Sequence, residues 1–259
     1  MLFRSNLIAL PAFADNCIWM LLGAVRAVVV DPGDAARVQE ALGWLQLQLV
    51  GILVTHHHAD HVGGVDALRP LLQGPVYGPR KEKIPTPFES LDEGDRVQLL
   101  GLDCGIIDVP GHTAGHIAYV QHGAAKQPLL FCGDTLFSAG CGRLFEDTPA
   151  QMHQSLSKFA ALPADTRVCG THEYTLSNLR FAAVVEPGNA ARASHQTRCE
   201  TLRANGQPTL PSSIGLELAI NPFLRCSVAE VVASANVHGS VNDSPVAVLT
   251  ALREWKNRF

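Results

Sequence analysis

The chain has few charged residues and no excess of basic ones. Of its 259 residues, 17% are charged and 47% are hydrophobic, and the formal net charge is −4. A protein that binds DNA or RNA normally carries a basic surface that meets the phosphates, so nucleic acid is disfavoured as a partner. The composition is that of a folded globular protein. The length suits one large α/β domain, or a main domain with a smaller one.

No apolar segment approaches the length needed to cross a membrane. The N-terminal apolar stretch carries Arg4 and is soon interrupted by Pro11, Asp15 and Asn16, which argues against a secretory signal peptide. The seven cysteines are odd in number and contain no CxxC pair, a pattern typical of reduced, structural thiols. We therefore expect a cytoplasmic protein with no membrane partner.

Short β-type runs alternate with helical patterns over the first two thirds of the chain. Strands are expected at 7–10, 17–22, 26–30, 50–55, 97–100, 105–109, 117–120, 129–132 and 166–169, and helices at 35–47, 65–72 and 149–162. From about Leu176 the patterns are helical only, at 177–185, 190–205 and 228–236. The sequence therefore predicts an α/β domain over residues 1–175 and a smaller, mostly helical domain over residues 176–259.

Four histidines and an aspartate lie in the segment THHHADHVGG (55–64), directly after an apolar run at 51–54. Imidazole and carboxylate groups both bind first-row divalent metals. A strand that ends in this segment therefore indicates a metal site, and two ligand sets side by side could hold two ions. For this segment alone, a solvated polyhistidine loop is the alternative.

Three further residues of metal-binding type each follow an apolar strand. His112 follows the expected strand at 105–109, Asp134 the strand at 129–132, and His172 the strand at 166–169. A single histidine at a strand end is more often a surface or hydrogen-bonded residue. Four loops that each follow a strand can gather at one edge of a sheet, so the joint pattern favours a metal centre.

This arrangement resembles the metallo-β-lactamase superfamily, through the motif His56-x-His58-x-Asp60-His61 followed in order by His112, Asp134 and His172. Within it, the chain is similar to the hydroxyacylglutathione hydrolase (glyoxalase II) family. That similarity extends over nearly the whole chain and is carried by THHHADHVGG (55–64), PGHTAGH (110–116), FCGDTLFSAGCGRLFE (131–146) and THEYTLSNLRFA (171–182). The resemblance implies an αββα sandwich with a smaller, mostly helical C-terminal domain.

The resemblance also implies a site for two divalent metal ions. By motif match, the first ion would be held by His56, His58 and His112 and the second by Asp60, His61 and His172, with Asp134 bridging the two. Asp60 and Asp134 would also be catalytic, as ligands that position a hydroxide between the ions. Zinc is the first choice for this nitrogen and oxygen ligand set, and iron or manganese would fit it as well. His116 is expected to orient a ligand or a backbone group rather than to be a ligand itself.

Two ions at such a site suit the hydrolysis of an acyl compound. Paired metals lower the pKa of a bound water and can hold hydroxide as a nucleophile, and one ion can stabilise the oxyanion that forms from a carbonyl. A thioester is a suitable substrate because a thiolate leaves with little help from an acid. The resemblance implies hydrolysis of S-(2-hydroxyacyl)glutathiones, chiefly S-D-lactoylglutathione, to glutathione and a 2-hydroxy acid, the second step of methylglyoxal detoxification.

Recognition of glutathione needs cations and hydrogen-bond donors, because glutathione carries two carboxylates and a peptide backbone. The resemblance offers four candidates: Arg143, Tyr174, Arg253 and Lys256. The last two would share a face of a helix, although a solvated basic tail has the same spacing. Some family members have lysine and tyrosine where this chain has Arg143 and Phe145. The arginine keeps the charge, whereas the phenylalanine cannot donate a hydrogen bond.

Other functions fit parts of the pattern. A persulfide dioxygenase of the same superfamily would use one iron and a glutathione-derived substrate, but that subgroup lacks the helical C-terminal extension. A non-catalytic metal-binding scaffold would typically have lost ligands, whereas all seven positions here carry one. A β-lactamase is typically exported, whereas this sequence shows no sign of a signal peptide. The formal net charge of −4 disfavours an RNA-processing enzyme. The expected partner is a small glutathione thioester, and the expected oligomeric state is a monomer.

Overall fold

The computed structural model describes residues 6–122 and 127–259, and the chain divides into two compact units. Unit 1 comprises Met1–Asp108 and Ala114–Gly133, and unit 2 comprises Val109–Thr113 and Asp134–Phe259. The predicted domain boundary near residue 175 stays a prediction. Among the described residues, no helix combines the length and the apolar character that a membrane crossing requires.

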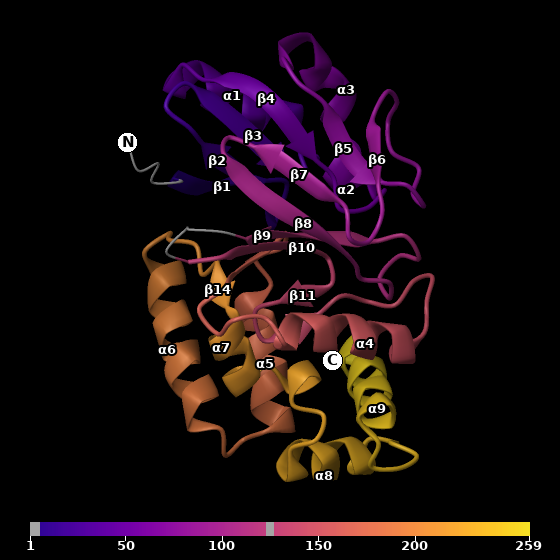
Figure 1. Ribbon diagram of the computed structural model, residues 1–259. Helices are drawn as coiled ribbons and strands as arrows, with labels where there is room; N and C mark the ends of the chain where they lie inside the picture. The colour runs from indigo at the N-terminus through magenta and orange to yellow at the C-terminus, as the bar shows by residue number, and fades with distance from the viewer. Residues whose placement is uncertain (1–5, 123–126) are drawn as a thin grey trace. The chain divides into compact units, whose positions relative to one another are not determined.

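Unit 1 contains a six-stranded sheet with the order β1-β2-β3-β4-β5-β6 (Figure 1). β1, β2 and β3 are antiparallel neighbours, whereas β3 to β6 run parallel. The strands are β1 (Asn6–Ala12), β2 (Asn16–Leu22), β3 (Arg26–Val30), β4 (Gln48–Leu53), β5 (Val76–Pro79) and β6 (Glu89–Leu91). Because parallel strands need crossover connections, helices join them: α1 (Ala35–Leu45) after β3, then α2 (Ala59–Val62), α3 (Val65–Leu68) and the 3-10 helix η1 (Arg69–Leu71) after β4.

Helix α1 begins and ends at local signals in the sequence. The Asp34 side chain caps its start by accepting a hydrogen bond from Ala36 N, and Gln46 ends it in a left-handed conformation. Val38 and Leu42, one turn apart, are buried in one apolar cluster with residues of the sheet. This packing anchors the helix on the sheet and fixes the carboxyl ends of β3 and β4, where polar side chains begin.

Unit 1 also contains four antiparallel strands in the order β10-β9-β8-β7. They are β7 (Arg96–Leu99), β8 (Leu102–Asp108), β9 (Ile117–His122) and β10 (Leu129–Gly133). The strands β13 (Arg167–Gly170) and β14 (Ser212–Ser213), which pair antiparallel, are part of unit 2. The predicted architecture of two sheets with helices is therefore found. β5 and β6 were not predicted, since β5 contains Gly78 and Pro79, which interrupt a strand pattern, and β6 is only three residues long.

Unit 2 is mostly helical (Figure 1). Its helices are α4 (Pro149–Ala160), α5 (Thr175–Val185), α6 (Ala190–Ala204), α7 (Ile214–Ile220), the 3-10 helix η2 (Pro222–Leu224), α8 (Ala229–Val237) and α9 (Pro245–Arg258). The patterns for α4, α5, α6 and α8 are confirmed to within a few residues. α4 begins as expected at Pro149, and Thr148 with Gln151 forms a capping box in front of it.

A two-stranded hairpin in unit 2 joins Asp134 to Arg143 along the chain. It consists of β11 (Leu136–Phe137) and β12 (Gly140–Cys141). Its turn places Ala139 at φ +56°, a left-handed conformation that is unfavourable for a residue with a Cβ. The buried Glu217 of α7 holds this turn, because its carboxylate accepts a hydrogen bond of 2.8 Å from Ala139 N.

Two buried asparagines hold the same hairpin. Asn178 of α5 donates from Nδ2 to the Ser138 carbonyl at 2.9 Å, and Asn221 donates from Nδ2 to the Gly140 carbonyl at 2.9 Å. Asn221 Nδ2 also lies 3.0 Å from Glu217 Oε2. The polar groups of the turn are thus satisfied by side chains that follow residue 175 in the sequence, so this part of the chain sets the shape of the hairpin.

Substituting Glu217 by alanine should lower the free energy of unfolding by about 2–4 kcal/mol, because Ala139 N and Asn221 Nδ2 would lose a buried acceptor. Urea denaturation measures the change. Glu200→Ala, which removes an exposed carboxylate from α6, is the control and should leave the unfolding midpoint unchanged. Equal midpoints for the two variants would contradict the role given to Glu217.

Candidate metal centre

Unit 1 gathers three of the predicted histidine ligands directly after β4. His56 and His61 are buried, and His58 is half-buried. His56 Nε2 lies 3.0 Å from His58 Nδ1, and the ring centroids of His56 and His61 are 4.0 Å apart. Asp60 Oδ2 lies 3.7 Å from His61 Nε2. Because nitrogen ligands of one tetrahedral zinc ion are about 3.3 Å apart, this spacing suits metal ligation.

Two contacts fix the position of Asp60. Asn16, the first residue of β2, donates from Nδ2 to Asp60 Oδ2 at 3.1 Å. The backbone of Asp60 also lies against Gly33, where a Cβ would overlap the Asp60 carbonyl. Only glycine fits at position 33, because the backbones of the turn after β3 and of the histidine segment are in direct contact there. The sequence gave no sign of this contact.

Asp31 supports the histidine segment from the carboxyl end of β3. It is buried at φ +51°, and its carboxylate accepts hydrogen bonds from Thr55 N at 2.8 Å and Thr55 Oγ1 at 2.9 Å. Asp31 Oδ2 lies 3.1 Å from His61 Nδ1. A negative charge there favours a proton on Nδ1 and leaves the lone pair of Nε2 for a metal. The sequence interpretation missed Asp31, which the structure places in contact with a candidate ligand.

Unit 2 brings the other three predicted ligands together. His112, Asp134 and His172 are all buried. One oxygen, Asp134 Oδ2, lies 3.4 Å from His112 Nε2 and 3.3 Å from His172 Nε2. His172 follows β13, as the sequence predicted, and Asp134 follows β10. A carboxylate oxygen that faces two imidazole nitrogens has the geometry of a shared ligand.

The orientation of His112 is set by a backbone group. Its Nδ1 lies 2.9 Å from the carbonyl oxygen of Arg143. A carbonyl can only accept a hydrogen bond, so Nδ1 carries the proton and Nε2, which faces Asp134, has the lone pair. Residue 143 therefore serves the metal centre through its backbone, which no side-chain pattern could have indicated.

Three groups of His and Asp side chains in the described part of the chain could hold a metal ion: His56, His58 and His112; His56, His61 and Asp134; and Asp60, His61 and His172. These groups are consistent with a binuclear metal site. They contain each of the seven predicted ligands. His116 is in none of them and stacks on His56 with ring centroids 4.5 Å apart.

The four predicted substrate-binding residues all belong to unit 2 and differ in exposure. The Arg143 side chain is exposed, and the Tyr174 ring stacks on His172 with a centroid distance of 4.7 Å. Arg253 is buried, and its Nη1 donates to the Cys141 carbonyl at 2.8 Å. Its guanidinium therefore helps to hold the hairpin. The exposed Phe145 ring makes a T-shaped contact with His112, with centroids 5.2 Å apart.

Lys256 lies among cations. Its Nζ is 5.0 Å from the centre of the Phe181 ring. Burial is the main cause that lowers the pKa of this amine, and the charges of Arg253, Arg180 and Arg143 lower it further, to about 8, while the Cys141 thiol acts in the opposite direction. Arg180 of α5 was not predicted, although it lies within the family-like segment at 171–182. We call Lys256, Arg143, Arg180 and Arg253 the cationic cluster.

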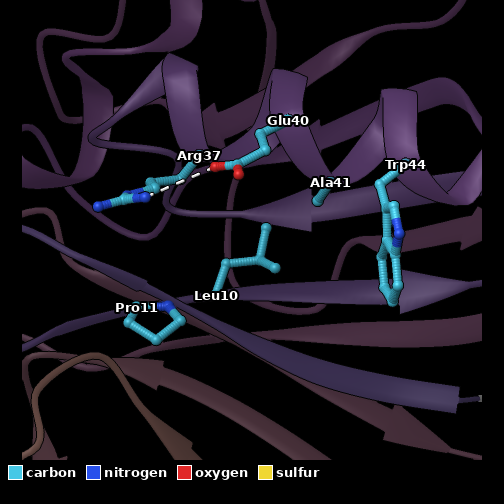
Figure 2. Close-up of a pocket in the computed structure, with 6 residues that line it drawn as sticks. All are labelled: Leu10, Pro11, Arg37, Glu40, Ala41 and Trp44. Carbon is cyan, nitrogen blue, oxygen red and sulfur yellow. Dashed lines mark ion pairs between the residues drawn. The ribbon is translucent and has the colours of Figure 1, made fainter.

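A surface hollow of about 570 Å³ lies elsewhere, on α1 and β1 of unit 1 (Figure 2). It is lined by Leu10, Pro11, Arg37, Glu40, Ala41 and Trp44. Arg37 and Glu40 form an ion pair across 3.5 Å, and the Trp44 ring is 84% exposed. None of the predicted site residues lines this hollow. We therefore assign it no part in the chemistry described above.

Comparison with protein families divides the chain in two. The model of the metallo-β-lactamase superfamily matches residues 13–172, and the model described as the hydroxyacylglutathione hydrolase C-terminus matches residues 173–259. A hydroxyacylglutathione hydrolase of Albidiferax ferrireducens is 56% identical over 98% of this chain and 100% of its own length. That of Pseudomonas aeruginosa (strain LESB58) is also 56% identical, over 97% of this chain and 98% of its own.

Solved structures show the same fold. The crystal structure of the BLEG-1 B3 metallo-β-lactamase covers 85% of this chain and 98% of its own, with a TM-score of 0.62 and 25% identity. ETHE1 from Myxococcus xanthus covers 98% of this chain and 100% of its own, with a TM-score of 0.64 and 22% identity. These matches confirm the predicted sandwich followed by a helical C-terminal region.

Substituting Asp31 by asparagine should weaken metal binding by about 10–100-fold, as expected for loss of a charge that orients a ligand. The amide keeps the shape of the carboxylate but removes the negative charge beside His61 Nδ1. Bound metal per chain, measured by elemental analysis after dialysis against chelators of increasing strength, tests this. Asp66→Asn, at an exposed carboxylate of α3, is the matched control. Asp31 has no such role if both variants retain metal equally.

Proposed function

Because this chain belongs to the hydroxyacylglutathione hydrolase family of the metallo-β-lactamase superfamily, we propose that it hydrolyses S-(2-hydroxyacyl)glutathiones, chiefly S-D-lactoylglutathione. The products would be glutathione and a 2-hydroxy acid, as in the second step of methylglyoxal detoxification. The enzyme is thus a thioesterase. The observation that carries this choice is the family match over residues 173–259, because the persulfide dioxygenase alternative lacks such an extension.

The ligand residues suit two divalent ions. We propose that one is held by His56, His58 and His112 and the other by Asp60, His61 and His172, with Asp134 shared. Zinc is our first choice, and iron or manganese would fit the same donors. When bound, such ions lower the pKa of a water molecule and polarise the thioester carbonyl. A scaffold without activity is disfavoured because the ligand set is complete.

The residues around the proposed ligands fix their orientation and their tautomers before a metal ion binds. The charge of Asp31 favours the Nδ1 proton on His61, and the Arg143 carbonyl holds the equivalent proton on His112. In both rings the lone pair of Nε2 is then available without a change of tautomer. Asn16 holds the Asp60 carboxylate. Ligands oriented before the ion arrives lose less entropy when it binds, which favours tight binding.

Glutathione recognition is proposed for the cationic cluster together with Tyr174. Arg143 and Lys256 would attract a carboxylate of the substrate, and the Tyr174 hydroxyl offers a hydrogen bond. Arg253, whose Nη1 is bonded to the hairpin, would act through its charge and by positioning its neighbours. Phe145 brings an apolar ring where some family members have a tyrosine. A cytoplasmic location is proposed from the cysteine pattern, and a monomer is compatible with the features described above.

Metal-replete protein should hydrolyse S-D-lactoylglutathione, followed as loss of the thioester absorbance, and a chelator should abolish the turnover. His58→Ala should lower both activity and bound metal, because it removes one ligand of the first proposed ion. Lack of turnover by a preparation that carries two metal ions per chain would refute the proposed function. Activity with glutathione persulfide and oxygen uptake would instead support the dioxygenase alternative.

The value of kcat/KM for S-D-lactoylglutathione should fall as the pH rises through about 8, the pKa of Lys256. The ammonium form, present below that pH, attracts the substrate carboxylate, and the neutral amine formed above it does not. In Lys256→Arg the charge persists to higher pH, so this decline should disappear from the pH profile. An identical decline in both proteins would assign it to another group.

A further inference from the structure

We propose that the amine of Lys256 is also an acyl-acceptor site, at which a thioester forms an amide and removes one positive charge from the cationic cluster. Only the choice of S-D-lactoylglutathione as the donor rests on the proposed function. A larger supply of thioester would acylate more Lys256 and so remove more of the positive charge that attracts the thioester. A chain modified in this way would bind an anionic substrate more weakly.

The surroundings of Lys256 are those of a nucleophile rather than of a structural ion pair. The side chain is half-buried, and its Nζ lies 5.0 Å from the centre of the Phe181 ring. Among the residues that the structure describes, it makes no ion pair, and its charged neighbours are arginines. Lys81 has the opposite environment, because its Nζ lies 2.7 Å from Asp108 Oδ2.

These surroundings act on the protonation of the two amines in opposite directions. Burial, together with the arginine charges, lowers the pKa of Lys256 to about 8, whereas the hydrogen bond to Asp108 raises the pKa of Lys81 above its usual 10.5. At pH 7.5 about one quarter of the Lys256 amine is neutral, against about one part in a thousand or less for Lys81. A desolvated lysine beside other cations is a known way to obtain a nucleophilic amine.

The lower basicity also reduces the intrinsic reactivity of the neutral amine. For thiols, nucleophilicity falls with pKa with a slope of about 0.4–0.5. A similar slope for amines would cost roughly tenfold over this difference in pKa. The gain in neutral amine is roughly 250-fold, so a net advantage of about twentyfold remains for Lys256. Protonation state therefore outweighs basicity in deciding which lysine reacts.

The reaction needs no component beyond the thioester. The lone pair of the neutral Nζ attacks the thioester carbonyl carbon, the carbon–sulfur bond breaks, and the electron pair leaves with the sulfur. The amine gives up a proton to water or to the departing thiolate, so the products are an amide on Lys256 and a free thiol. No oxidant or reductant is involved. A glutathione carboxylate bound at the ammonium form should protect the site.

The test uses the metal-replete full-length protein at pH 7.5 with S-D-lactoylglutathione added continuously. Peptide mass spectrometry then measures lactoylation at Lys81, Lys83, Lys158 and Lys256. We expect the initial rate at Lys256 to exceed that at Lys81 by about twentyfold. Rates that are equal within a factor of two would overturn the proposal. Thioester loss is followed in the same vessel, so an acylated but inactive protein would refute only the proposed function.

Two variants test whether the cationic cluster causes the reactivity. Arg180→Gln removes one of the charges that lower the Lys256 pKa, so acylation at Lys256 should slow by a factor of two or more at pH 7.5. Arg203→Gln removes an exposed arginine of α6 and should leave the rate unchanged. Equal rates in both variants would contradict this origin. Free glutathione should slow acylation of Lys256 but not of Lys81. A lack of protection would contradict the proposed contact between Lys256 and glutathione.

Discussion

The position of a proton on each buried histidine governs what the rest of the site can do. An imidazole binds a metal through an unprotonated nitrogen, so its other nitrogen must hold the proton. His61 lies beside the Asp31 carboxylate, and His112 donates to the Arg143 carbonyl. Each partner stands at a position fixed by its own element: the end of β3 in one unit, and the segment after β12 in the other. The orientation of these two histidines, which we propose as ligands, thus depends on groups outside the proposed ligand set.

Buried polar groups of the hairpin impose a second requirement. A backbone N–H or carbonyl without water must find a partner in the protein. Glu217, Asn178 and Asn221 supply these partners, and Arg253 adds a bond to the Cys141 carbonyl. The helices after residue 175 therefore do more than present cations. They hold the segment that begins after Asp134 and ends before Arg143, which links the ligand set of unit 2 to the cationic cluster.

Much of the fold and of the candidate site could be predicted from local patterns. The apolar run before His56 predicted the buried strand β4, and Pro149 marked the start of α4. Long motifs pointed to the family that the comparisons then showed. β5 was missed because Gly78 and Pro79 interrupt its pattern, and β6 because it has only three residues. The helical pattern predicted at 65–72 ends as an α-helix at Leu68, where η1 with Pro70 follows. Asp31 and Arg180 were missed because their roles depend on neighbours distant in the sequence.

The sequence by itself determined the types of the candidate ligands, their order and their placement after strands, because metal chemistry restricts which side chains can serve. It also determined the hydrolase family, since long motifs extend over nearly the whole chain. Only the tertiary structure decided which nitrogen of His61 and His112 faces a ligand, that Gly33 must lack a Cβ, and that Lys256 lies among arginines. Proton positions and pKa values depend on distances between residues far apart in the chain, and those distances exist only after folding.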